Sequence, residues 1–415
     1  MTTRQAMNAE TAPKPAADTL RDELVDMLVA RGTVQSSQVE AAMRAVPRHL
    51  FLDNEPLEVA YADESVITRR SDDGRPLSSV SQPSVVATML EQARLQSGER
   101  VLEIGAGKGY NAALLARLVD PDGEVTTVDI NPDLVTDARQ VLTAVSDKKV
   151  HVICADGEYG AKDHAPYSLV IVTVGAAELP PAWLDQLTQD GRIVVPLRFR
   201  GLFRLIAFER EDGHLVSRDM KVFGFVSMQG DGALPQRTVP LGSEDVQLVV
   251  DDGQPADAQA LSQALSFPRQ EAWTGVALGG AEGVLPSLDL WLANVLDAYG
   301  RLHADGEAVK RGVVGLTLPA GSSATWERDS LAYLTVRDTA GPGDAGGYEL
   351  GACAYGPESE RLAARLAEQV RVWDREKRSG SGGVIRAYPA GTPDDQLVPG
   401  RVINRRHTRF VISHS

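Results

Sequence analysis

The stretch Val101-Leu-Glu-Ile-Gly-Ala-Gly-Lys-Gly-Tyr110 decides the fold of this chain. Its first four residues are mostly apolar and predict a buried strand, and the residues from Asn111 onward have the composition and spacing of a helix. The glycines between them, Gly105, Gly107 and Gly109, permit positive φ angles and let a ligand approach the backbone without a Cβ in the way. Strand, glycine turn and helix together are typical of the opening of a nucleotide-binding βαβ unit.

An acidic residue at the end of the following strand supports this interpretation. Residues 124–128 predict that strand, and it ends in Asp129, about 20 residues after the last glycine. An acid in this place accepts hydrogen bonds from both hydroxyls of a ribose. The sequence therefore predicts a cofactor that contains a ribose, bound at the glycine turn.

Length and composition predict a globular protein with more than one core. The chain has 415 residues, of which 43% are hydrophobic and 24% charged. Its net charge of −15 counts against nucleic acid as a partner, because phosphate binding needs a basic surface. No apolar run has the length of a membrane helix, so we expect no membrane partner. Cys154 and Cys353 form neither a disulfide framework nor a zinc motif, so we expect no metal and a cytoplasmic location.

Strands and helices alternate on both sides of the glycine turn. After the first βαβ unit, apolar runs predict strands at residues 150–154, 167–174 and 191–197. Two further strand signals, at residues 203–210 and 215–226, flank the turn sequence Glu211-Asp-Gly-His214 and predict an antiparallel hairpin. This pattern predicts a doubly wound, Rossmann-like α/β sheet with an antiparallel edge.

We expect three segments along the chain: a disordered tail at residues 1–18, an α/β catalytic domain at 19–229 and a C-terminal α+β domain at 230–415. The last boundary lies where the composition shifts, at Gly230-Asp-Gly-Ala-Leu-Pro235. Beyond it, helices are expected at residues 257–265, 287–299 and 358–377, and strands at 313–318, 330–336, 348–355, 384–388 and 408–412.

Other blocks of sequence occur in one order along residues 20–228. They are Val46-Pro-Arg-His-Leu-Phe51, Ala60-Tyr-Ala-Asp63, Ser79-Val-Ser-Gln-Pro83, the glycine stretch itself, and the later blocks Asp156-Gly157, Val174-Gly-Ala-Ala177 and Phe223-Gly-Phe-Val-Ser-Met228. In this order they resemble the protein-L-isoaspartate O-methyltransferase family. The Ser-Gln-Pro block upstream of this glycine stretch is specific to that family.

The chain departs from the pattern of that family at a few positions and in its length. Lys108 stands where the family usually has Ser, Ser79 replaces a Thr, and Asp129 replaces a Glu. The compact repair enzymes of the family lack a C-terminal half of this size. A long member of this kind resembles the methyltransferases found with ribosomally made, modified peptides, notably the FxLD lanthipeptide systems.

The resemblance implies a cofactor and a set of site residues. The cofactor is S-adenosyl-L-methionine, which leaves as S-adenosyl-L-homocysteine, and Ser79 and Ser81 are implied to be catalytic by orienting the acceptor carboxylate. The implied cofactor-binding residues are Gln82, Glu103, Gly105, Ala106, Gly107, Asp129, Ile130, Asp156, Gly157 and Val174. The implied substrate-binding residues are Ser79, Val80, Ser81, Lys108, Gly175 and Ala176.

Simpler interpretations of these residues stay open at this point. The two serines also suit a turn and an N-cap for the helix that follows them. Asp156-Gly157 also suits an ordinary turn at a strand end. Lys108 fits a solvated side chain, although a cation there would suit an acidic acceptor. Arg48 and His49 fit loop packing.

The resemblance leads to a ranked set of expected functions. A carboxylate is already a nucleophile at neutral pH, so the reaction needs alignment and exclusion of water rather than a general base. We expect methylation of an aspartate in a modified precursor peptide of the lanthipeptide kind, leading through a succinimide to isoaspartate. The alternatives are a general isoaspartate repair enzyme with an accessory domain and an inactive cofactor-binding peptide scaffold. A nucleic-acid methyltransferase is disfavoured, because Val174-Gly-Ala-Ala177 stands where a base-binding Asn-Pro-Pro-Tyr motif would be.

Overall fold

The computed structural model describes residues 16–145, 149–251, 253–279, 286–318, 321–339, 347–378, 380 and 382–414. The chain divides into two compact units, residues 1–155 and 156–415, and each is described by itself. Most of the expected disordered tail at residues 1–18 lies outside the described residues. The described chain becomes helical at Ala17, two residues before the expected start of the catalytic domain.

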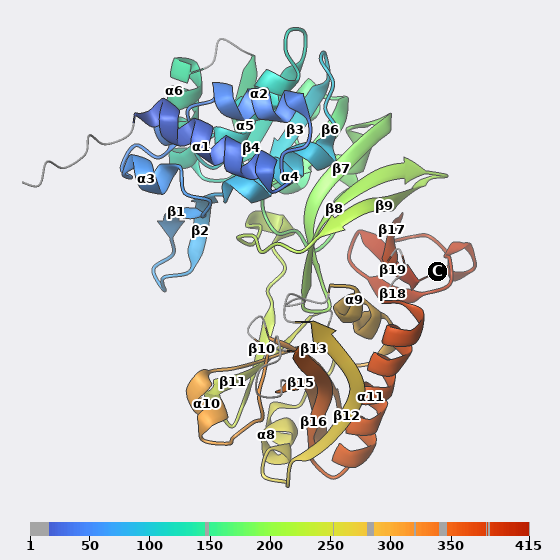
Figure 1. Ribbon diagram of the computed structural model, residues 1–415. Coiled ribbons are helices and arrows are strands. Elements are labelled where there is room, and N and C mark those ends of the chain that lie inside the picture. Colours follow the sequence, from blue (N-terminus) through green and yellow to red (C-terminus); the bar gives the residue numbers. More distant parts are fainter. Residues whose placement is uncertain are drawn as a thin grey trace, which may run out of the picture. The chain divides into compact units, whose positions relative to one another are not determined.

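The first unit opens with short helices and a hairpin (Figure 1). Ser36 caps the second helix, because its hydroxyl accepts a hydrogen bond from the N–H of Val39 at 3.3 Å. The residues after α2 contain two short helical turns and an antiparallel hairpin. In order, the elements are α1 (Ala17–Ala30), α2 (Ser37–Ala45), η1 (Arg48–Phe51), α3 (Leu57–Ala60), β1 (Val66–Arg70), β2 (Pro76–Val80) and α4 (Pro83–Ala93).

The first unit continues with the predicted βαβ unit and its repetition. Strands β3 (Arg100–Ile104), β4 (Glu124–Asp129) and β5 (Val150–Cys154) pair in parallel in that order. Helices α5 (Tyr110–Leu118) and α6 (Pro132–Val145) connect them. The interior of β3 is fully buried, as expected for a parallel strand covered on both faces.

The second unit begins with the remaining strands of the α/β fold. Strand β6 (Tyr167–Val172) pairs in parallel with β7 (Leu187–Phe199), and β8 (Leu202–Glu211) and β9 (His214–Lys221) follow in antiparallel pairing. The short helix α7 (Pro181–Asp185) lies between β6 and β7. The predicted α/β class with an antiparallel edge hairpin is confirmed.

A second sheet follows in the same unit, and it is entirely antiparallel. Its seven strands run in the order β10-β11-β13-β14-β15-β16-β12. They are β10 (Arg237–Leu241), β11 (Ser243–Val250), β12 (Gln270–Gly279), β13 (Gly300–Ala304), β14 (Ser322–Glu327), β15 (Ser330–Asp338) and β16 (Gly347–Tyr355). The helices of this region are α8 (Ala258–Ala264), α9 (Pro286–Val295), α10 (Gly306–Lys310) and α11 (Ser359–Glu376).

Helix α11 covers one side of this sheet, along β12, β15 and β16 (Figure 1). One face of this helix is apolar and buried: Leu362, Leu366, Val370 and Trp373 are each no more than 1% exposed. The predicted α+β character of this region is confirmed. One expected strand is wrong, because residues 313–318 form a loop whose Val314 fills the core of the second sheet.

The end of the chain corrects the expected domain division. Strands β17 (Gly383–Pro389), β18 (Arg401–Asn404) and β19 (Thr408–His414) leave the second sheet and extend the sheet of β6 to β9. β17 pairs with β9 at two positions, Arg386 with Val216 and Ala387 with Leu215. Residues 230–415 are therefore not one separate domain, since their last strands complete the edge that the β8–β9 hairpin leaves open.

The end of β7 and the turn that follows it anchor the second sheet. The guanidinium of Arg198 lies 3.1 Å from the carboxylate of Asp251, and their side chains are 5% and 1% exposed. The N–H of Gly201 donates to the same carboxylate at 2.7 Å. Arg200 donates to the carbonyl of Leu296 at 2.7 Å. Removal of either partner from such a buried ion pair would strongly destabilise the fold, because the other charge would stay buried without compensation.

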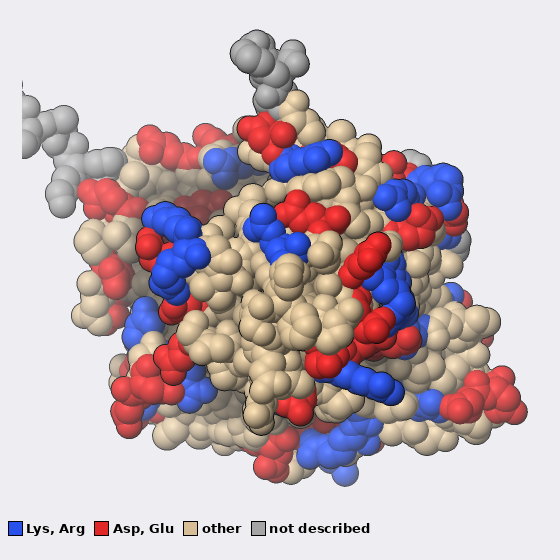
Figure 2. Space-filling view, turned by 90° about the horizontal axis from the view of Figure 1, so that it is seen from below, with Lys and Arg blue, Asp and Glu red and all other residues tan. Residues whose placement is uncertain are grey.

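Figure 2 shows a face on which Lys and Arg side chains are interspersed with Asp and Glu. Many Lys, Arg, Asp and Glu side chains of the described residues are paired, as Arg361 is with Glu327 at 2.5 Å and Arg311 with Asp245 at 2.6 Å. The face drawn in Figure 2 carries no continuous basic field.

None of the helices in the described ranges combines the length and the apolar character needed to cross a membrane.

Candidate active site

The glycine turn at the end of β3 has the backbone shape that the sequence predicts. Gly105, Gly107 and Gly109 have φ angles of +99°, +51° and +91°, which side chains other than glycine rarely adopt. The N–H of Gly107 donates to the carboxylate of Asp129 at 2.9 Å. A Cβ at position 109 would come within 3.1 Å of Leu142. The turn therefore leaves its backbone open to a ligand and is fixed to the end of the next strand.

Asp129 lies at the tip of β4, where the ribose is expected. Its other carboxylate oxygen accepts the N–H of Asn131 at 2.9 Å, so both oxygens are oriented by backbone donors. Burial raises the pKa of this carboxyl group above its usual value, and the backbone hydrogen bonds oppose that rise. The neighbouring Ile130 is 38% exposed, which suits an apolar contact with a flat ring. The structure brings Asp129, Ile130 and the glycine turn together.

Glu103 lies beneath the turn rather than on its surface. Its side chain is fully buried, and its oxygens accept hydrogen bonds from Thr127 at 2.5 Å and from Asn111 at 2.8 Å. Burial raises its pKa to about 7, although these two hydrogen bonds favour the charged form. This placement favours a supporting role, in which Glu103 joins β3 to β4 and to the start of α5.

The predicted catalytic serines lie on and just after β2. Ser79 pairs with Ile67 in the β1–β2 hairpin, so it does not form the turn that the simpler interpretation expected. A Cβ on Gly107 would lie 3.8 Å from the carbonyl oxygen of Ser79, so β2 runs beside the glycine turn. The structure thus brings Ser79, with Val80 and Ser81 next to it, to the loop that is expected to hold the cofactor.

The N-terminus of α4 shows whether these serines serve as its N-cap, which was the other simple interpretation. The N-cap residue is Gln82, whose side chain makes no capping hydrogen bond. The capping bond comes from Asp63 instead, whose carboxylate accepts the N–H of Ser84 at 2.9 Å. Ser81 is therefore not the cap of the helix, and Asp63 braces the segment that carries it.

Arg48 is a functional-site support that the sequence interpretation missed. Its side chain is 1% exposed and donates to the carbonyl of Ala60 at 2.9 Å and to that of Val80 at 3.5 Å. The guanidinium also lies 5.0 Å from the ring centre of Tyr110. Burial lowers its pKa. Arg48 therefore ties the serine segment to the first residue of α5, and the Val-Pro-Arg block was the available signal.

Lys108, the residue of the turn that departs from the family pattern, is directed away from an acceptor role. Its ammonium group lies 2.7 Å from the carboxylate of Asp137 on α6. The side chain is only 20% exposed. The structure therefore favours a local ion pair over the predicted contact with an acidic substrate.

In the second unit, Asp156 and Gly157 form a fixed turn rather than a loose strand end. The two carboxylate oxygens of Asp156 accept the N–H of Glu158 at 2.9 Å and that of Asp231 at 2.7 Å. The carbonyl of Gly157 accepts a hydrogen bond from the buried indole of Trp183 at 2.8 Å. The contact of Asp156 with the adenine of the cofactor stays a prediction.

The remaining predicted block, residues 174–176, is tied to the block that follows β9. The N–H of Gly175 donates to the carbonyl of Val226 at 2.7 Å, and the N–H of Met228 donates to the carbonyl of Gly175 at 3.1 Å. Val174 and Gly175 are half-buried, whereas Ala176 is 1% exposed. Within this block, Val174 and Gly175 have surface for a substrate or cofactor, and Ala176 supports them.

Comparison with known proteins identifies the family of this chain. A sequence model of protein-L-isoaspartate(D-aspartate) O-methyltransferases matches residues 19–232, slightly more than half of the chain. The chain belongs to this family. The methyltransferase is therefore a carboxyl O-methyltransferase that depends on S-adenosylmethionine, which confirms the predicted enzyme class and cofactor.

Named relatives match about half of the methyltransferase. The protein-L-isoaspartate O-methyltransferase of Methanopyrus kandleri is 37% identical over 213 residues, which are 51% of this chain and 92% of that protein. That of Thermotoga maritima is 33% identical over 214 residues, 51% of this chain and 67% of that protein. A solved structure of the same name covers 88% of this chain and 96% of its own, with 22% identity and a TM-score of 0.49.

The residues of the first unit fit the cofactor of the methyltransferase. When bound, S-adenosylmethionine supplies a methyl group on a positively charged sulfur. The open backbone at Gly107 and the carboxylate of Asp129 offer the contacts that its ribose needs. The hydroxyls of Ser79 and Ser81 remain the predicted donors to an acceptor carboxylate, whose own charge makes it the nucleophile.

Proposed function

We propose that this methyltransferase acts on an aspartate in a ribosomally made, modified peptide of the lanthipeptide kind. The carboxylate oxygen takes the methyl group as the carbon–sulfur bond breaks, and the electron pair of that bond stays on sulfur. The backbone nitrogen of the next peptide residue then attacks the ester carbonyl, loses its proton and releases methanol. Water opens the resulting succinimide to aspartate or isoaspartate. The reaction thus converts an ordinary aspartate to isoaspartate, whereas repair would start from an isoaspartate.

One observation carries this proposal. A cavity of about 490 Å³ is lined by residues of the α/β fold, of the second sheet and of the C-terminal strands together, among them Glu178, Asp231, Val250, Gln254 and Asn404. Glu178 follows Ala176 by two residues, so the cavity adjoins the predicted acceptor block. The second sheet lies beyond residue 232, where the family match ends. An added sheet that borders the acceptor block suits recognition of one defined peptide.

The proposed location is the cytoplasm. Both cysteines are free, Cys154 on the surface and Cys353 in the interior. Free thiols suit a reducing compartment, and a ribosomally made precursor is modified where it is synthesised.

General isoaspartate repair is the second candidate, and one observation favours it. The Thermotoga maritima relative, which is named as an isoaspartate methyltransferase, has about a third of its own length outside the match. Additional sequence is therefore compatible with that name. The two candidates differ in the carboxylate that they accept.

A substrate comparison tests the proposal. The full-length protein, with S-adenosylmethionine, is offered a linear isoaspartyl peptide and, separately, a thioether-cyclised peptide with ordinary aspartate, and methanol release is measured. We expect release with the cyclised peptide. Release with the isoaspartyl peptide alone would establish repair instead. Binding of S-adenosylhomocysteine without release from either peptide would favour an inactive scaffold.

A matched pair of variants tests the cavity. Leu234 lines it and is 43% exposed, whereas Leu316 lies elsewhere in the second unit and is 50% exposed. Leu234→Trp is expected to raise the KM for the cyclised peptide at least fivefold and to leave the affinity for S-adenosylhomocysteine unchanged. Leu316→Trp is expected to change neither. Equal effects of the two substitutions would contradict a role for the cavity.

A further inference from the structure

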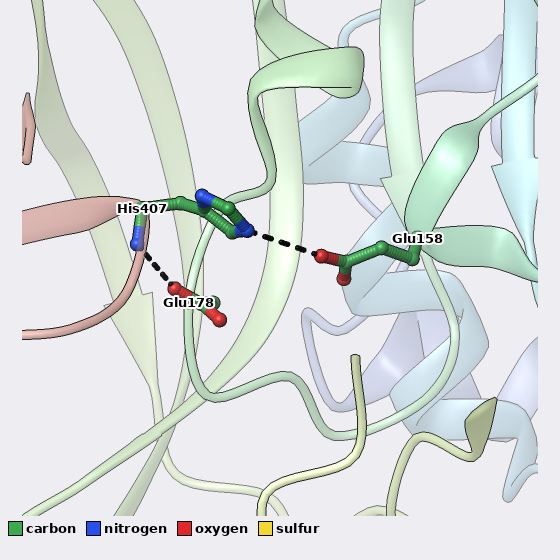
Figure 3. A group of neighbouring side chains, drawn as sticks. All are labelled: Glu158, Glu178 and His407. Carbon is green, nitrogen blue, oxygen red and sulfur yellow. Dashed lines mark hydrogen bonds and ion pairs between the residues drawn. The ribbon is translucent and has the colours of Figure 1, made fainter. Parts of the chain in front are cut away.

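An arginine and a histidine near the C-terminus reach into the α/β fold. Arg406 and His407 lie in the turn between β18 and β19, and we call this pair the C-terminal latch. The guanidinium of Arg406 lies 2.5 Å from the carboxylate of Glu158 and 3.4 Å from that of Glu178. The backbone N–H of His407 donates to Glu178 at 2.8 Å, and its Nε2 lies 3.6 Å from Glu158 (Figure 3).

The two carboxylates belong to the two loops that the predicted site uses. Glu158 follows Asp156, the predicted adenine contact, by two residues, and its own N–H donates to that carboxylate at 2.9 Å. Glu178 follows Ala176 of the predicted acceptor block by two residues. The latch therefore joins the loop after β5 to the loop after β6.

The backbone beside the latch is fixed to the same place. The hydroxyl of Thr408 donates to the carbonyl of Leu179 at 2.9 Å and accepts the N–H of that residue at 3.1 Å. Thr408 is 2% exposed, so both hydrogen bonds are shielded from water. The turn thus has a rigid base, and the two latch side chains project from it toward the carboxylates.

The carboxylate of Glu158 is buried, and it therefore needs the cation that the latch supplies. The side chain of Glu158 is 5% exposed and that of Glu178 is 14% exposed, whereas that of Arg406 is 53% exposed. A buried carboxylate needs a partner, and the most direct cation for both groups is Arg406. Loss of the guanidinium would leave Glu158 buried beside a second negative charge, and the loop that carries it would shift to reach water.

A metal ion is a less suitable occupant of this cluster. Glu158, Glu178 and His407 each offer a ligand atom within 4.8 Å of the others. The guanidinium of Arg406 already bridges the two carboxylates, so a dication would have to displace it. The second oxygen of Glu158 is directed to Gly232 instead, where an added Cβ would lie 2.6 Å away. The cluster therefore fits a charge-paired tie between loops.

We propose that the C-terminal latch positions the cofactor loop and the acceptor loop of the methyltransferase with respect to each other. Arg406 is a positioning residue: it acts on the cofactor side through Glu158 and on the acceptor side through Glu178. The proposal rests on the predicted contacts of Asp156 and Gly175, and it holds for either acceptor that the methyltransferase accepts. It assigns to the last strands of the chain a part in catalysis as well as in closing the sheet edge.

Double-mutant cycles on full-length protein test this role. The dissociation constant of S-adenosylhomocysteine is measured for Arg406→Ala, Glu158→Gln and the double variant. The KM of whichever peptide is methylated is measured for Arg406→Ala, Glu178→Gln and their double variant. We expect each single substitution to raise its dissociation constant or KM about three- to thirtyfold. Each double variant should show no larger increase than the more damaging of its two single substitutions, since the two residues of each pair act as a unit.

Control variants separate positioning from a general loss of stability. Arg409, on β19, pairs with Asp394 at 2.5 Å outside the latch, so Arg409→Ala is expected to leave both readouts unchanged. Arg406→Lys is expected to recover most of the affinity, because it keeps the charge. Additive double variants, an equal effect of Arg409→Ala, or unchanged readouts in Arg406→Ala would each overturn the proposal. Because the cofactor arm needs no peptide, its result is independent of the proposed substrate.

Discussion

Two turns of this molecule place charged groups at the ends of strands, and they are held in different ways. The glycine turn after β3 is fixed by the bond from Gly107 to Asp129, which spans 22 residues of sequence. The turn between β18 and β19 is fixed by bonds from Arg406 to Glu158 and from His407 to Glu178, which span 248 and 229 residues. The first is encoded by neighbouring sequence, whereas the second exists only when the whole second unit has folded.

This difference predicts that the two regions fail separately. Damage to the anchor of the second sheet should disturb the C-terminal turn, because the chain passes through that sheet before it returns to β9. The glycine turn belongs to the other unit and depends on contacts within β3, β4 and α5. The predictions below test the two regions in turn.

The largest effect is expected from the anchor. Arg198→Met leaves the buried carboxylate of Asp251 without its ion-pair partner, and we expect it to lower the free energy of unfolding by about 3–5 kcal/mol. Arg218→Met, which breaks half-exposed pairs with Glu209 and Glu211, should cost less than about 1 kcal/mol. Urea unfolding of both variants measures this. Equal losses would show that the anchor is not what holds the second sheet.

Glu103 should give the first unit a characteristic dependence on pH. The unfolded carboxyl ionises near 4.5, whereas the buried one keeps its proton up to about 7. The folded state therefore binds more protons between these values, and stability falls as the pH rises through that window, by on the order of 3 kcal/mol, and is flat above it.

Glu103→Gln keeps the size of the side chain and one acceptor oxygen, and it cannot ionise. The variant is expected to lose this slope and to be the more stable protein at pH 8. Thermal unfolding from pH 5 to pH 8 measures the difference between the two proteins. A slope that persists in the variant would assign it to other groups.

A substitution of Asp129 tests the role of the glycine turn in binding the cofactor. Asp129→Ala removes the acceptor expected for the ribose hydroxyls and the acceptor that holds Gly107. Two hydrogen bonds to a charged group at about 1.5 kcal/mol each correspond to a loss of about 100-fold in affinity for S-adenosylhomocysteine. Calorimetry measures it, and Asp133→Ala, whose side chain is 75% exposed, is the control. An affinity within fivefold of the parent would remove Asp129 from the site.

The sequence predicted what short-range patterns encode. The glycine turn, Asp129 and the strand order around them follow from local periodicity and glycine chemistry, and the structure bears out that geometry. The helix at residues 358–377 was predicted for the same reason, and α11 spans Ser359–Glu376. By contrast, β13 and β14 were missed. Gly300-Arg-Leu-His-Ala304 has no β-branched residue, and β14 begins with two serines, which do not signal a strand.

What depends on distant contacts could not be predicted. Arg48 was interpreted as loop packing, because its partners Ala60 and Val80 are 12 and 32 residues away. The pairing of β17 with β9 joins strands that lie more than 160 residues apart, and no local pattern announces it. The latch belongs to the same class. Arg406 and His407 carried no motif, and only the fold brings them to Glu158 and Glu178.

The smallest effect is expected at Lys108, where the sequence and the structure suggest different roles. If its ammonium group attracted an acidic acceptor, Lys108→Met would raise the peptide KM several-fold and leave stability unchanged. The ion pair with Asp137 instead predicts a loss below about 1 kcal/mol and a KM within twofold of the parent, because both side chains reach solvent. Asp137→Asn breaks the same pair while it keeps the lysine, so it should reproduce the loss of stability. A raised KM in Lys108→Met with an unaltered Asp137→Asn would restore the acceptor role, because only the lysine would then matter to the peptide.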